Sequence, residues 1–205
     1  MALQEQGEFK FNLPSLQSAT NGIGRGNFMV IIARPETGKT AFWVSLVASV
    51  GGFAWQQKKV SIFANEEPAI RTQMRLLNAC TGLQRGSILN GSRDLTKKVW
   101  GDINPYVENF DCVGKTMDDL NEYCTNNEVD ILIIDQLDKI NVTGKFNATH
   151  EKLREVYTQA RELAKRHNIL VIGMSQASAE AQGRSRVTFS TMENSKTGKA
   201  AEADL

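Results

Sequence analysis

The chain has 205 residues, of which 41% are hydrophobic and 23% charged, and this length and balance suit one α/β domain with a sizeable core. Its formal net charge of +1 excludes a global basic field, so any binding of nucleic acid must use a local patch. Three cysteines without a C-x-x-C motif argue against a zinc site and favour a reduced, cytoplasmic setting, and no signal peptide or apolar run of membrane-spanning length is seen.

The first predicted strand leads into a loop of the kind that binds phosphates. Residues 28–32 form a short apolar run, which is typical of a buried strand. The segment ARPETGKTAF follows at residues 33–42, and residues 41–50 are interpreted as a helix. The N-terminus of that helix faces the loop, so its dipole favours an anion there.

This loop nearly matches the pattern G-x-x-x-x-G-K-[ST], in which backbone N–H groups and a lysine hold the β- and γ-phosphates and a hydroxyl binds Mg²⁺. Alanine replaces the first glycine, at a position that needs only a residue small enough to leave the strand in a tight turn. A chance turn before a helix is the weaker interpretation, because strand, loop and helix occur in the required order. The predicted nucleotide-binding residues are Ala33, Arg34, Pro35, Glu36, Thr37, Gly38, Lys39, Thr40 and Ala41, with Lys39 also catalytic and Thr40 also a ligand of Mg²⁺.

A second predicted strand, at residues 60–64, precedes two glutamates and a proline. A glutamate within reach of the γ-phosphate orients and deprotonates the attacking water. The alternative is that both glutamates are solvated in the first turn of the helix predicted over residues 69–80, where acidic residues are favoured. We assign Glu66 to catalysis and Glu67 to the start of that helix.

The middle of the chain gives weaker signals. Residues 83–109 are polar and helical only in pieces, and residues 110–113 are interpreted as a short strand. Thr116 has the pattern of an N-cap, with Asp119 three residues later, and it opens a helix that ends near Asn126.

The clearest buried strand covers residues 130–134 and is followed by Asp135. A carboxylate at a strand end beside a phosphate loop holds the water shell of Mg²⁺. Taken alone, such an aspartate is more often a turn residue, but the phosphate loop favours the functional interpretation. We therefore predict that Asp135 binds Mg²⁺, partly through water.

An amphipathic helix over residues 149–167 leads to the last predicted strand, at residues 169–175, and to Gln176. The neutral amide of Gln176 can donate to a γ-phosphate oxygen and couple the loss of that phosphate to the following loop. The alternative is a surface glutamine in a loop. We include Gln176 among the catalytic residues.

The predicted strands alternate with predicted helices along the chain. This order predicts an α/β fold with a mostly parallel, twisted sheet and helices on both faces. Ligands of such sheets bind at the carboxyl ends of the strands. Every candidate residue named above lies at such an end, so we expect them to form one site.

Four segments together resemble the hexameric replicative DNA helicases of the DnaB type, within the RecA-like P-loop ATPases of superfamily 4, and phage versions in particular. In that family the loop typically begins with Ala-Arg-Pro and ends Gly-Lys-Thr-Ala-Phe, which ARPETGKTAF resembles. The segments SIFANEEP, ILIIDQLDKI and LVIGMSQA are similar to its further motifs. The resemblance covers residues 12–205 and implies an N-terminal extension at residues 1–11 and a RecA-like motor domain at 12–205, truncated at its C-terminal end.

This resemblance implies an enzyme that uses ATP and Mg²⁺ to translocate on single-stranded DNA and unwind duplex DNA, in the cytoplasm of a bacterial cell or a phage-infected host. It also implies a ring, hexameric in the full-length protein, with primase as a further partner and no membrane partner. The family's arginine finger normally lies after the stretch that ends at Leu205. We therefore expect these residues alone to be monomeric or weakly associated and to hydrolyse ATP slowly.

The family also implies two loops that contact DNA. The first covers residues 141–150, and the second covers residues 178–199, which carry few large apolar groups. Their cations would neutralise phosphates without sequence preference, and contact with the DNA backbone is favoured over base stacking because aromatic residues do not alternate with these cations. The alternative is a solvated loop with ordinary charges. The candidate DNA contacts are Lys145, Arg184, Arg186, Lys196 and Lys199.

Two other classes of function remain open at this stage. A RecA- or RadA-type recombinase or a KaiC-like ATPase shares the same core, and strand exchange in place of strand displacement would identify the recombinase. A nucleotide-gated scaffold or loader would bind ATP with little turnover, which single-turnover hydrolysis would reveal.

Overall fold

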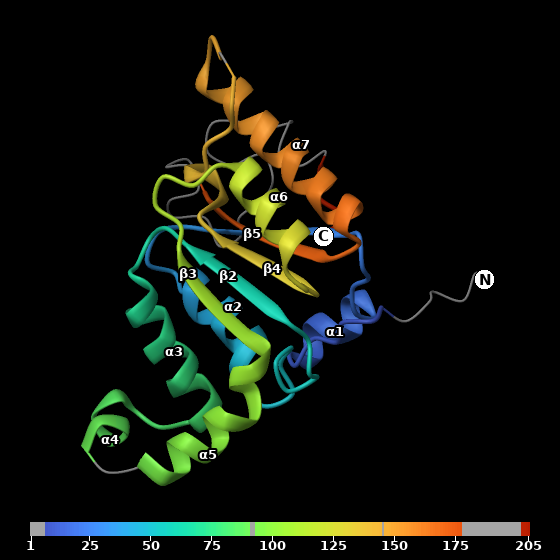
Figure 1. Ribbon diagram of the computed structural model, residues 1–205. Coiled ribbons are helices and arrows are strands. Elements are labelled where there is room, and N and C mark those ends of the chain that lie inside the picture. The colour runs from blue at the N-terminus through green and yellow to red at the C-terminus, as the bar shows by residue number, and fades with distance from the viewer. Residues whose placement is uncertain (1–6, 91–92, 145, 178–201) are drawn as a thin grey trace, which may run out of the picture.

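The computed structural model of the chain describes residues 7–90, 93–144, 146–177 and 202–205. Within these residues, the centre of the molecule is a sheet of five parallel strands in the order β1-β5-β4-β2-β3 (Figure 1). The strands are β1 (Phe28–Ala33), β2 (Val60–Ala64), β3 (Val107–Asp111), β4 (Ile131–Asp135) and β5 (Leu170–Gln176).

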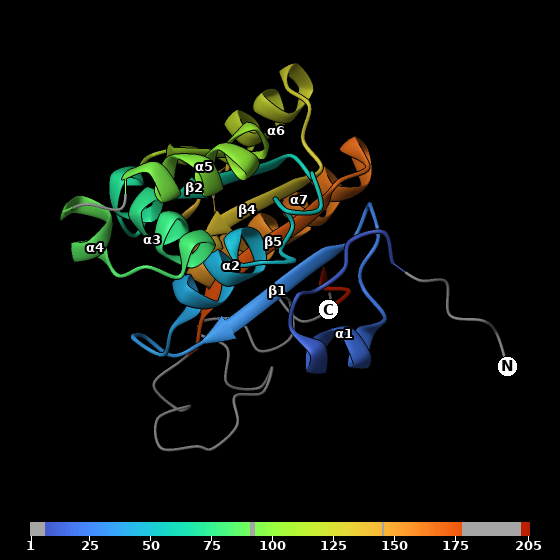
Figure 2. The ribbon, with the colours of Figure 1, turned by 90° about the horizontal axis from the view of Figure 1, so that it is seen from below.

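Helices cover both faces of this sheet, which confirms the predicted α/β architecture (Figures 1 and 2). α2, α3 and α5 pack on one face, and α6 and α7 pack on the other. The helices are α1 (Pro14–Thr20), α2 (Lys39–Ala48), α3 (Ala69–Thr81), α4 (Arg85–Asn90), α5 (Arg93–Ile103), α6 (Met117–Asn126) and α7 (Thr149–His167), and the short 3₁₀ turns are η1 (Asn104–Tyr106) and η2 (Leu137–Lys139).

Strand β4 shows why these residues form a sheet that is buried on both sides. All of its residues are buried, and successive side chains of a strand point to opposite faces. Ile131 and Ile133 join the apolar cluster beneath α2 and α3, whereas Leu132 and Ile134 join the cluster beneath α6 and α7. A continuous apolar run is the expected pattern of a strand that helices cover on both faces.

Because all five strands are parallel, their carboxyl ends lie at one edge of the sheet. The chain passes from β1 to β2, and the later strands β4 and β5 fill the space between them. The ends of β1, β5, β4 and β2 therefore lie next to one another. A crevice outside such ends is where open α/β sheets bind their ligands.

The first described residues are attached to the sheet by a small cluster around Phe9. Phe9 is fully buried and forms a bridge with Ile23. The cationic groups of Arg25 and Lys58 lie 5.5 and 5.4 Å from the centre of its ring, and both cations also pair with Glu8 at 2.8 Å. The cluster thus joins the segment before α1 to the loop before β2.

The last described residues lie along the free edge of β1 (Figure 2). The N–H of Asp204 donates to the carbonyl oxygen of Phe28 at 2.8 Å, and the N–H of Val30 donates to that of Leu205 at 2.8 Å. These residues therefore continue the hydrogen-bonding pattern of the sheet.

Strand β3 corrects the predicted strand at residues 110–113. It begins at Val107, which pairs with Val60 and is buried, and it ends at Asp111. The carboxylate of Asp111 accepts the N–H of Ala69 at 2.7 Å. This polar residue therefore closes the strand, and Cys112 and its neighbour belong to the turn before α6.

The helices mostly begin and end near the predicted residues. α2 begins two residues earlier than predicted and ends at Ala48, because Ser49 has an extended backbone. The capping box of α6 is confirmed, since the Thr116 hydroxyl accepts the N–H of Asp119 at 3.2 Å and the Asp119 carboxylate accepts that of Thr116 at 2.7 Å. The unassigned residues 83–109 contain α4, α5 and η1, and α1 was not predicted.

Of the helices described, none combines the length and the apolar character that crossing a membrane requires.

Candidate nucleotide-binding site

The loop between β1 and α2 contains a closed turn and two residues with left-handed backbone conformation. The Thr37 hydroxyl donates to the carbonyl oxygen of Arg34 at 2.7 Å and closes the turn. Glu36 and Gly38 both have positive φ angles, of 59° and 96°. Such left-handed residues break the strand and helix geometry and let successive N–H groups converge on an anion. Ala33 is not among the residues with positive φ, which explains why alanine is accommodated at the first position.

Lys39 is the clearest sign that this loop holds an anion. Its side chain is buried at 7% exposure, and its ammonium Nζ has no hydrogen-bond partner. Burying an ammonium without a partner is unfavourable unless a negative group is supplied. Lys39 is also the first residue of α2, where the backbone N–H groups have no acceptors within the helix. A phosphate at this position would satisfy both the ammonium and these N–H groups.

Asp135 lies at the end of β4 and is held from the side of α2. Its Oδ2 atom accepts the indole N–H of Trp43 at 3.2 Å and lies 3.5 Å from the hydroxyl of Thr40. Its Oδ1 atom is buried and has no partner. A hydroxyl and a carboxylate oxygen are hard ligands, which Mg²⁺ and its bound waters prefer. The residues present therefore fit a nucleotide with its Mg²⁺.

The electrostatics of Asp135 show that the predicted residues share one environment. Burial raises the pKa of Asp135 above its ordinary value, and the nearby charge of Glu66 acts in the same direction. The hydrogen bond from Trp43 and the charge of Lys39 act in the opposite direction. Charges from the end of β2 and from the start of α2 thus act on one carboxylate at the end of β4.

The two glutamates after β2 have different surroundings. Glu66 is exposed, whereas Glu67 accepts two hydrogen bonds from Arg75, at 2.9 and 2.6 Å. The Arg75 guanidinium holds the pKa of Glu67 below its ordinary value. Glu67 is therefore occupied by an ion pair, and the N–H at the start of α3 is bound by Asp111 in its place. This leaves Glu66 as the glutamate that is free to act on a ligand.

Gln176 ends β5 directly beside the phosphate loop. It pairs with Ala33 in the register of β1 and β5, and the N–H of Ala177 donates to the carbonyl oxygen of Ala33 at 3.0 Å. The backbone N–H of Gln176 donates to Asp138 at 3.0 Å. The structure thus brings Lys39, Thr40, Glu66, Asp135 and Gln176 to the same edge of the sheet.

Sequence reasoning missed two residues of this region, Trp43 and Asp138. Trp43 is part of an apolar helix pattern and looks like an ordinary core residue, so no local signal marked its hydrogen bond to Asp135. Asp138 lies three residues after Asp135 in a short turn, and this proximity is the signal that could have identified it. The predicted DNA contacts Lys145, Arg184, Arg186, Lys196 and Lys199 lie outside the described residues.

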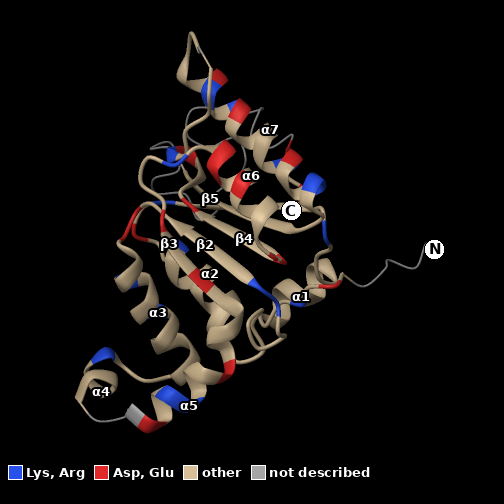
Figure 3. Ribbon diagram, viewed as in Figure 1, with Lys and Arg blue, Asp and Glu red and all other residues tan. Residues whose placement is uncertain are grey.

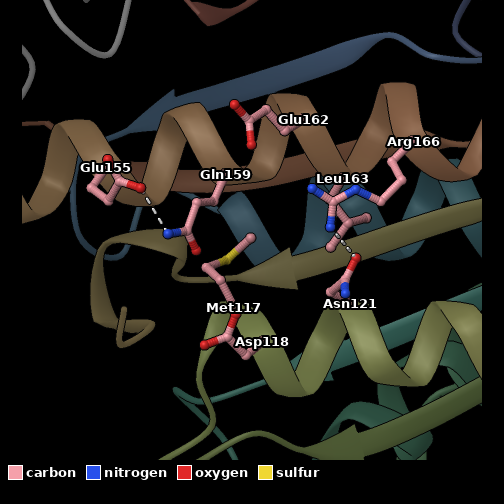
Figure 4. Close-up of a pocket in the computed structure, with 8 residues that line it drawn as sticks. All are labelled: Met117, Asp118, Asn121, Glu155, Gln159, Glu162, Leu163 and Arg166. Carbon is pink, nitrogen blue, oxygen red and sulfur yellow. Dashed lines mark hydrogen bonds between the residues drawn. The ribbon is translucent and has the colours of Figure 1, made fainter. Parts of the chain in front are cut away.

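The surface of α7 and the pocket between α6 and α7 give no comparable site. Basic and acidic residues are interspersed along α7, as expected of a solvated helix face (Figure 3). An open pocket of about 180 Å³ lies between α6 and α7 (Figure 4). Its polar groups are partly paired with one another, as in the hydrogen bonds from Gln159 to Glu155 and from Arg166 to Asn121. None of the residues that line it belongs to the strand-end site.

Comparison with known proteins identifies the family of the chain. The model of the DnaB-like helicase C terminal domain family matches residues 9–198. A probable plasmid replicative DNA helicase of Chlamydia psittaci is 30% identical over 175 residues, which cover 79% of this chain and 37% of that protein. The replicative DNA helicase DnaB of Geobacillus stearothermophilus is 25% identical over 182 residues, which cover 82% of this chain and 39% of that protein. The chain thus spans less than two fifths of the length of these relatives.

Two solved structures have the same fold. One is described as an ATPase domain and superposes with a TM-score of 0.78 at 20% identity, over 98% of this chain and 76% of that one. The other is a DnaB-like replicative helicase, described with its interactions with primase, and superposes with a TM-score of 0.77 at 22% identity, over 94% of this chain and 49% of that one.

Proposed function

The chain belongs to the family of DnaB-like helicase C-terminal domains, and from this premise we propose that it is the ATP-hydrolysing motor of a replicative DNA helicase. The proposal includes translocation on single-stranded DNA and unwinding of duplex DNA, which are activities of a whole protein. The names of the relatives support it, since they are replicative helicases of bacteria and of plasmids.

One observation supports the nucleotide site above all others. The Lys39 ammonium, at the start of α2, and one oxygen of Asp135, at the end of β4, are both buried without hydrogen-bond partners. The Thr40 hydroxyl belongs to the same group, because it lies 3.5 Å from the other oxygen of Asp135. The unpaired ammonium fits the phosphates of a ligand, and the unpaired carboxylate oxygen fits its Mg²⁺.

The residues then take distinct roles. ATP with Mg²⁺ supplies the phosphoanhydride bond and the charge that the metal neutralises. Lys39 and the N–H groups of the loop bind the β- and γ-phosphates, and Thr40 and Asp135 hold the metal and its waters. Glu66 accepts the proton of the attacking water. Gln176 donates to a γ-phosphate oxygen and responds when that phosphate leaves.

The partners follow from the family and belong to the proposal. Single-stranded DNA would be bound through its backbone by the cations predicted in residues 141–150 and 178–199. Self-association into a ring would place such loops around one strand. Primase is a candidate partner, because the structure of one similar helicase was described with its interactions with primase.

Three substitutions test the nucleotide site. Lys39→Ala should abolish ATP binding, because it removes the buried cation. Glu66→Gln should keep ATP affinity and lower single-turnover hydrolysis by about 100-fold or more, since general-base catalysis contributes factors of this order. Glu67→Gln is the matched control and should hydrolyse ATP nearly as the parent chain does. ATP binding that survives Lys39→Ala, or hydrolysis that depends on Glu67 and not on Glu66, would contradict these roles.

A further inference from the structure

Asp138 accepts hydrogen bonds from two elements beside the site, and none of the roles above uses it. It lies in the 3₁₀ turn η2, directly after β4. Its Oδ2 atom accepts the hydroxyl of Ser175 at 2.9 Å and the backbone N–H of Gln176 at 3.0 Å. Its Oδ1 atom accepts the hydroxyl of Tyr157, from α7, at 2.9 Å.

The register of the sheet explains why a side chain is needed at this point. The pairing between β4 and β5 ends at Ile134 and Gly173, so β5 continues to Gln176 with a strand neighbour only on the side of β1. On the open side, the carboxylate of Asp138 accepts the N–H that a longer β4 would have bound. Asp138 thus replaces a strand at the end of β5.

The turn that carries Asp138 is itself held firmly. Gln136 has a positive φ of 63° and its carbonyl oxygen accepts the side-chain N–H of Asn65 at 3.0 Å, which joins the turn to the end of β2. Leu137 packs so closely on Gly173 that an added Cβ there would lie 2.7 Å from it. The turn therefore has little freedom to move relative to β5.

The hydroxyl of Tyr157 stays protonated and donates a hydrogen bond to the carboxylate of Asp138. The tyrosine is fully buried, and its ring meets Phe28 edge-on with 6.0 Å between the ring centres. Burial, and then the charge of Asp138, raise the pKa of Tyr157 well above its ordinary value, so the phenol keeps its proton. Asp138 is thus fixed from α7 as well as from its own turn.

We propose that Asp138 is a positioning residue. By binding the backbone N–H of Gln176 it holds the end of β5, and with it the side-chain amide of Gln176, against the nucleotide site. This inference rests on the proposed function, because it gives Gln176 its place beside the γ-phosphate. A partly buried carboxylate that accepts hydrogen bonds from two secondary elements sets an orientation that apolar packing alone leaves loose. A small misplacement of such a group lowers a rate by up to about 100-fold.

The first test needs no nucleotide. Hydrogen exchange of single backbone amides, followed by NMR in the 205-residue chain, should show faster exchange of the Gln176 amide in Asp138→Ala. The amide of Val171, which donates to the carbonyl oxygen of Asn27 at 3.0 Å at the other end of β5, serves as the internal reference and should keep its rate. Equal exchange of Gln176 in the parent and the variant would overturn the proposal.

The second test separates positioning from stability. Asp119→Ala is the matched control, because Asp119 also accepts a backbone N–H and a hydroxyl, at 2.7 and 2.8 Å, but at the start of α6. In single-turnover assays, Asp138→Ala should lose about tenfold or more in hydrolysis rate with ATP affinity changed less than about threefold, a loss within the range of such misplacements. Asp138→Asn retains one side-chain oxygen for Ser175 and Gln176 and should recover most of the rate. A similar loss of rate in Asp119→Ala would assign the effect to stability and overturn the proposal.

The third test asks whether Asp138 acts through Gln176. In a double-mutant cycle, Asp138→Ala should add little to the loss already caused by Gln176→Ala, because both changes remove the same contact with the ligand. Independent, multiplicative losses would contradict the proposal. Failure of the proposed function would appear differently, as absence of Lys39-dependent ATP binding in the parent chain.

Discussion

At the scale of single residues, the site combines groups that are unfavourable for folding and useful for a ligand. Asp135 is 2% exposed, yet one of its oxygens has no partner, and Lys39 is buried with an unpaired ammonium. Groups of this kind lower stability unless something binds them. Their presence at the start of α2 and the end of β4 is therefore easier to explain by a bound ligand than by a need of the fold.

Asp135→Asn tests this explanation. Burial raises the pKa of Asp135 in the folded chain above its ordinary value of 3.8, so the fold prefers the neutral form. The stability that this preference contributes is complete below the unfolded pKa and is lost as pH rises through the folded pKa. The variant should consequently be more stable than the parent at pH 7, with a difference that disappears in acid, while Mg²⁺-dependent hydrolysis falls.

Urea unfolding at a series of pH values measures this difference. Asp102→Asn, which changes an exposed aspartate of α5, is the control and should leave stability nearly unchanged. If Asp135→Asn instead lowers stability at neutral pH, the carboxylate is favourable to the fold and the explanation fails.

The sequence predicted the residues of this site that belong to local motifs and missed those that do not. Lys39 and Thr40 are recognised because the chemistry of the loop needs them at fixed spacing. The bonds from Trp43 to Asp135 and from Gln176 to Asp138 join residues far apart in the chain, and only the order of the strands brings them together. That order is a property of the whole sheet, which no single motif encodes.

At the scale of elements, the phosphate loop depends on a backbone shape as much as on side chains. Gly38 has a φ of 96°, which other residues rarely adopt, and an added Cβ would meet no atom within 4 Å. Glycine is therefore required there by conformation and not by space.

Gly38→Ala should then affect binding more than folding. We expect a loss of about 1 kcal/mol in the free energy of unfolding, the order of the cost of a left-handed conformation for alanine. ATP affinity should fall further than this, because relaxation of the loop turns its N–H groups away from the phosphates. Gly101→Ala in α5 is the matched control, since Gly101 has no positive φ and an added Cβ there would also meet no atom within 4 Å, and it should keep the ATP affinity without loss of stability. Calorimetric titration measures the ATP affinity, and urea unfolding measures the free energy of unfolding. An unchanged ATP affinity in Gly38→Ala would contradict the predicted role of the loop backbone in binding phosphates.

Secondary elements were predictable where one signal dominated. α7 has the predicted bounds because its apolar positions recur at helical spacing over 19 residues. The start of β3 was predicted three residues too late, because the polar residues Glu108 and Asn109 hide a strand whose start is set by pairing with β2. The short helices α4 and α5 contact α3, and their bounds were not predicted because residues 83–109 are mostly polar.

At the scale of the whole molecule, one sheet joins two separate apolar clusters. The cluster beneath α2 and α3 includes Trp43, with Trp55 and Trp100 packed against it. The cluster beneath α6 and α7 includes Cys112 and Cys124. Because the same strands supply side chains to both clusters, the loss of one face removes the support of the other. We therefore expect the described domain to unfold as one cooperative unit.

Phe9→Ala tests this expectation from the far end of the chain. Phe9 is fully buried in the cluster that holds the tryptophans, and replacing a buried phenylalanine with alanine lowers stability by about 3–5 kcal/mol. Tryptophan fluorescence reports on that face, because all three tryptophans belong to it. Thiol reactivity in a Cys80→Ala background reports on the opposite face.

The thiols of Cys112 and Cys124 are suitable probes because burial makes them unreactive in the folded chain. It raises the pKa of Cys112 to about 11 and that of Cys124 to about 12, so the reactive thiolate forms only when the chain opens. Phe9→Ala should shift the urea midpoints of fluorescence and of thiol reactivity by the same amount, although Phe9 contacts only one cluster. Val113→Ala, at a side chain that is 82% exposed, should shift neither. If the urea midpoint of fluorescence shifts and that of thiol reactivity does not, the two faces unfold separately and the sheet does not couple them. A nucleotide bound at the strand ends would then stabilise only part of the domain.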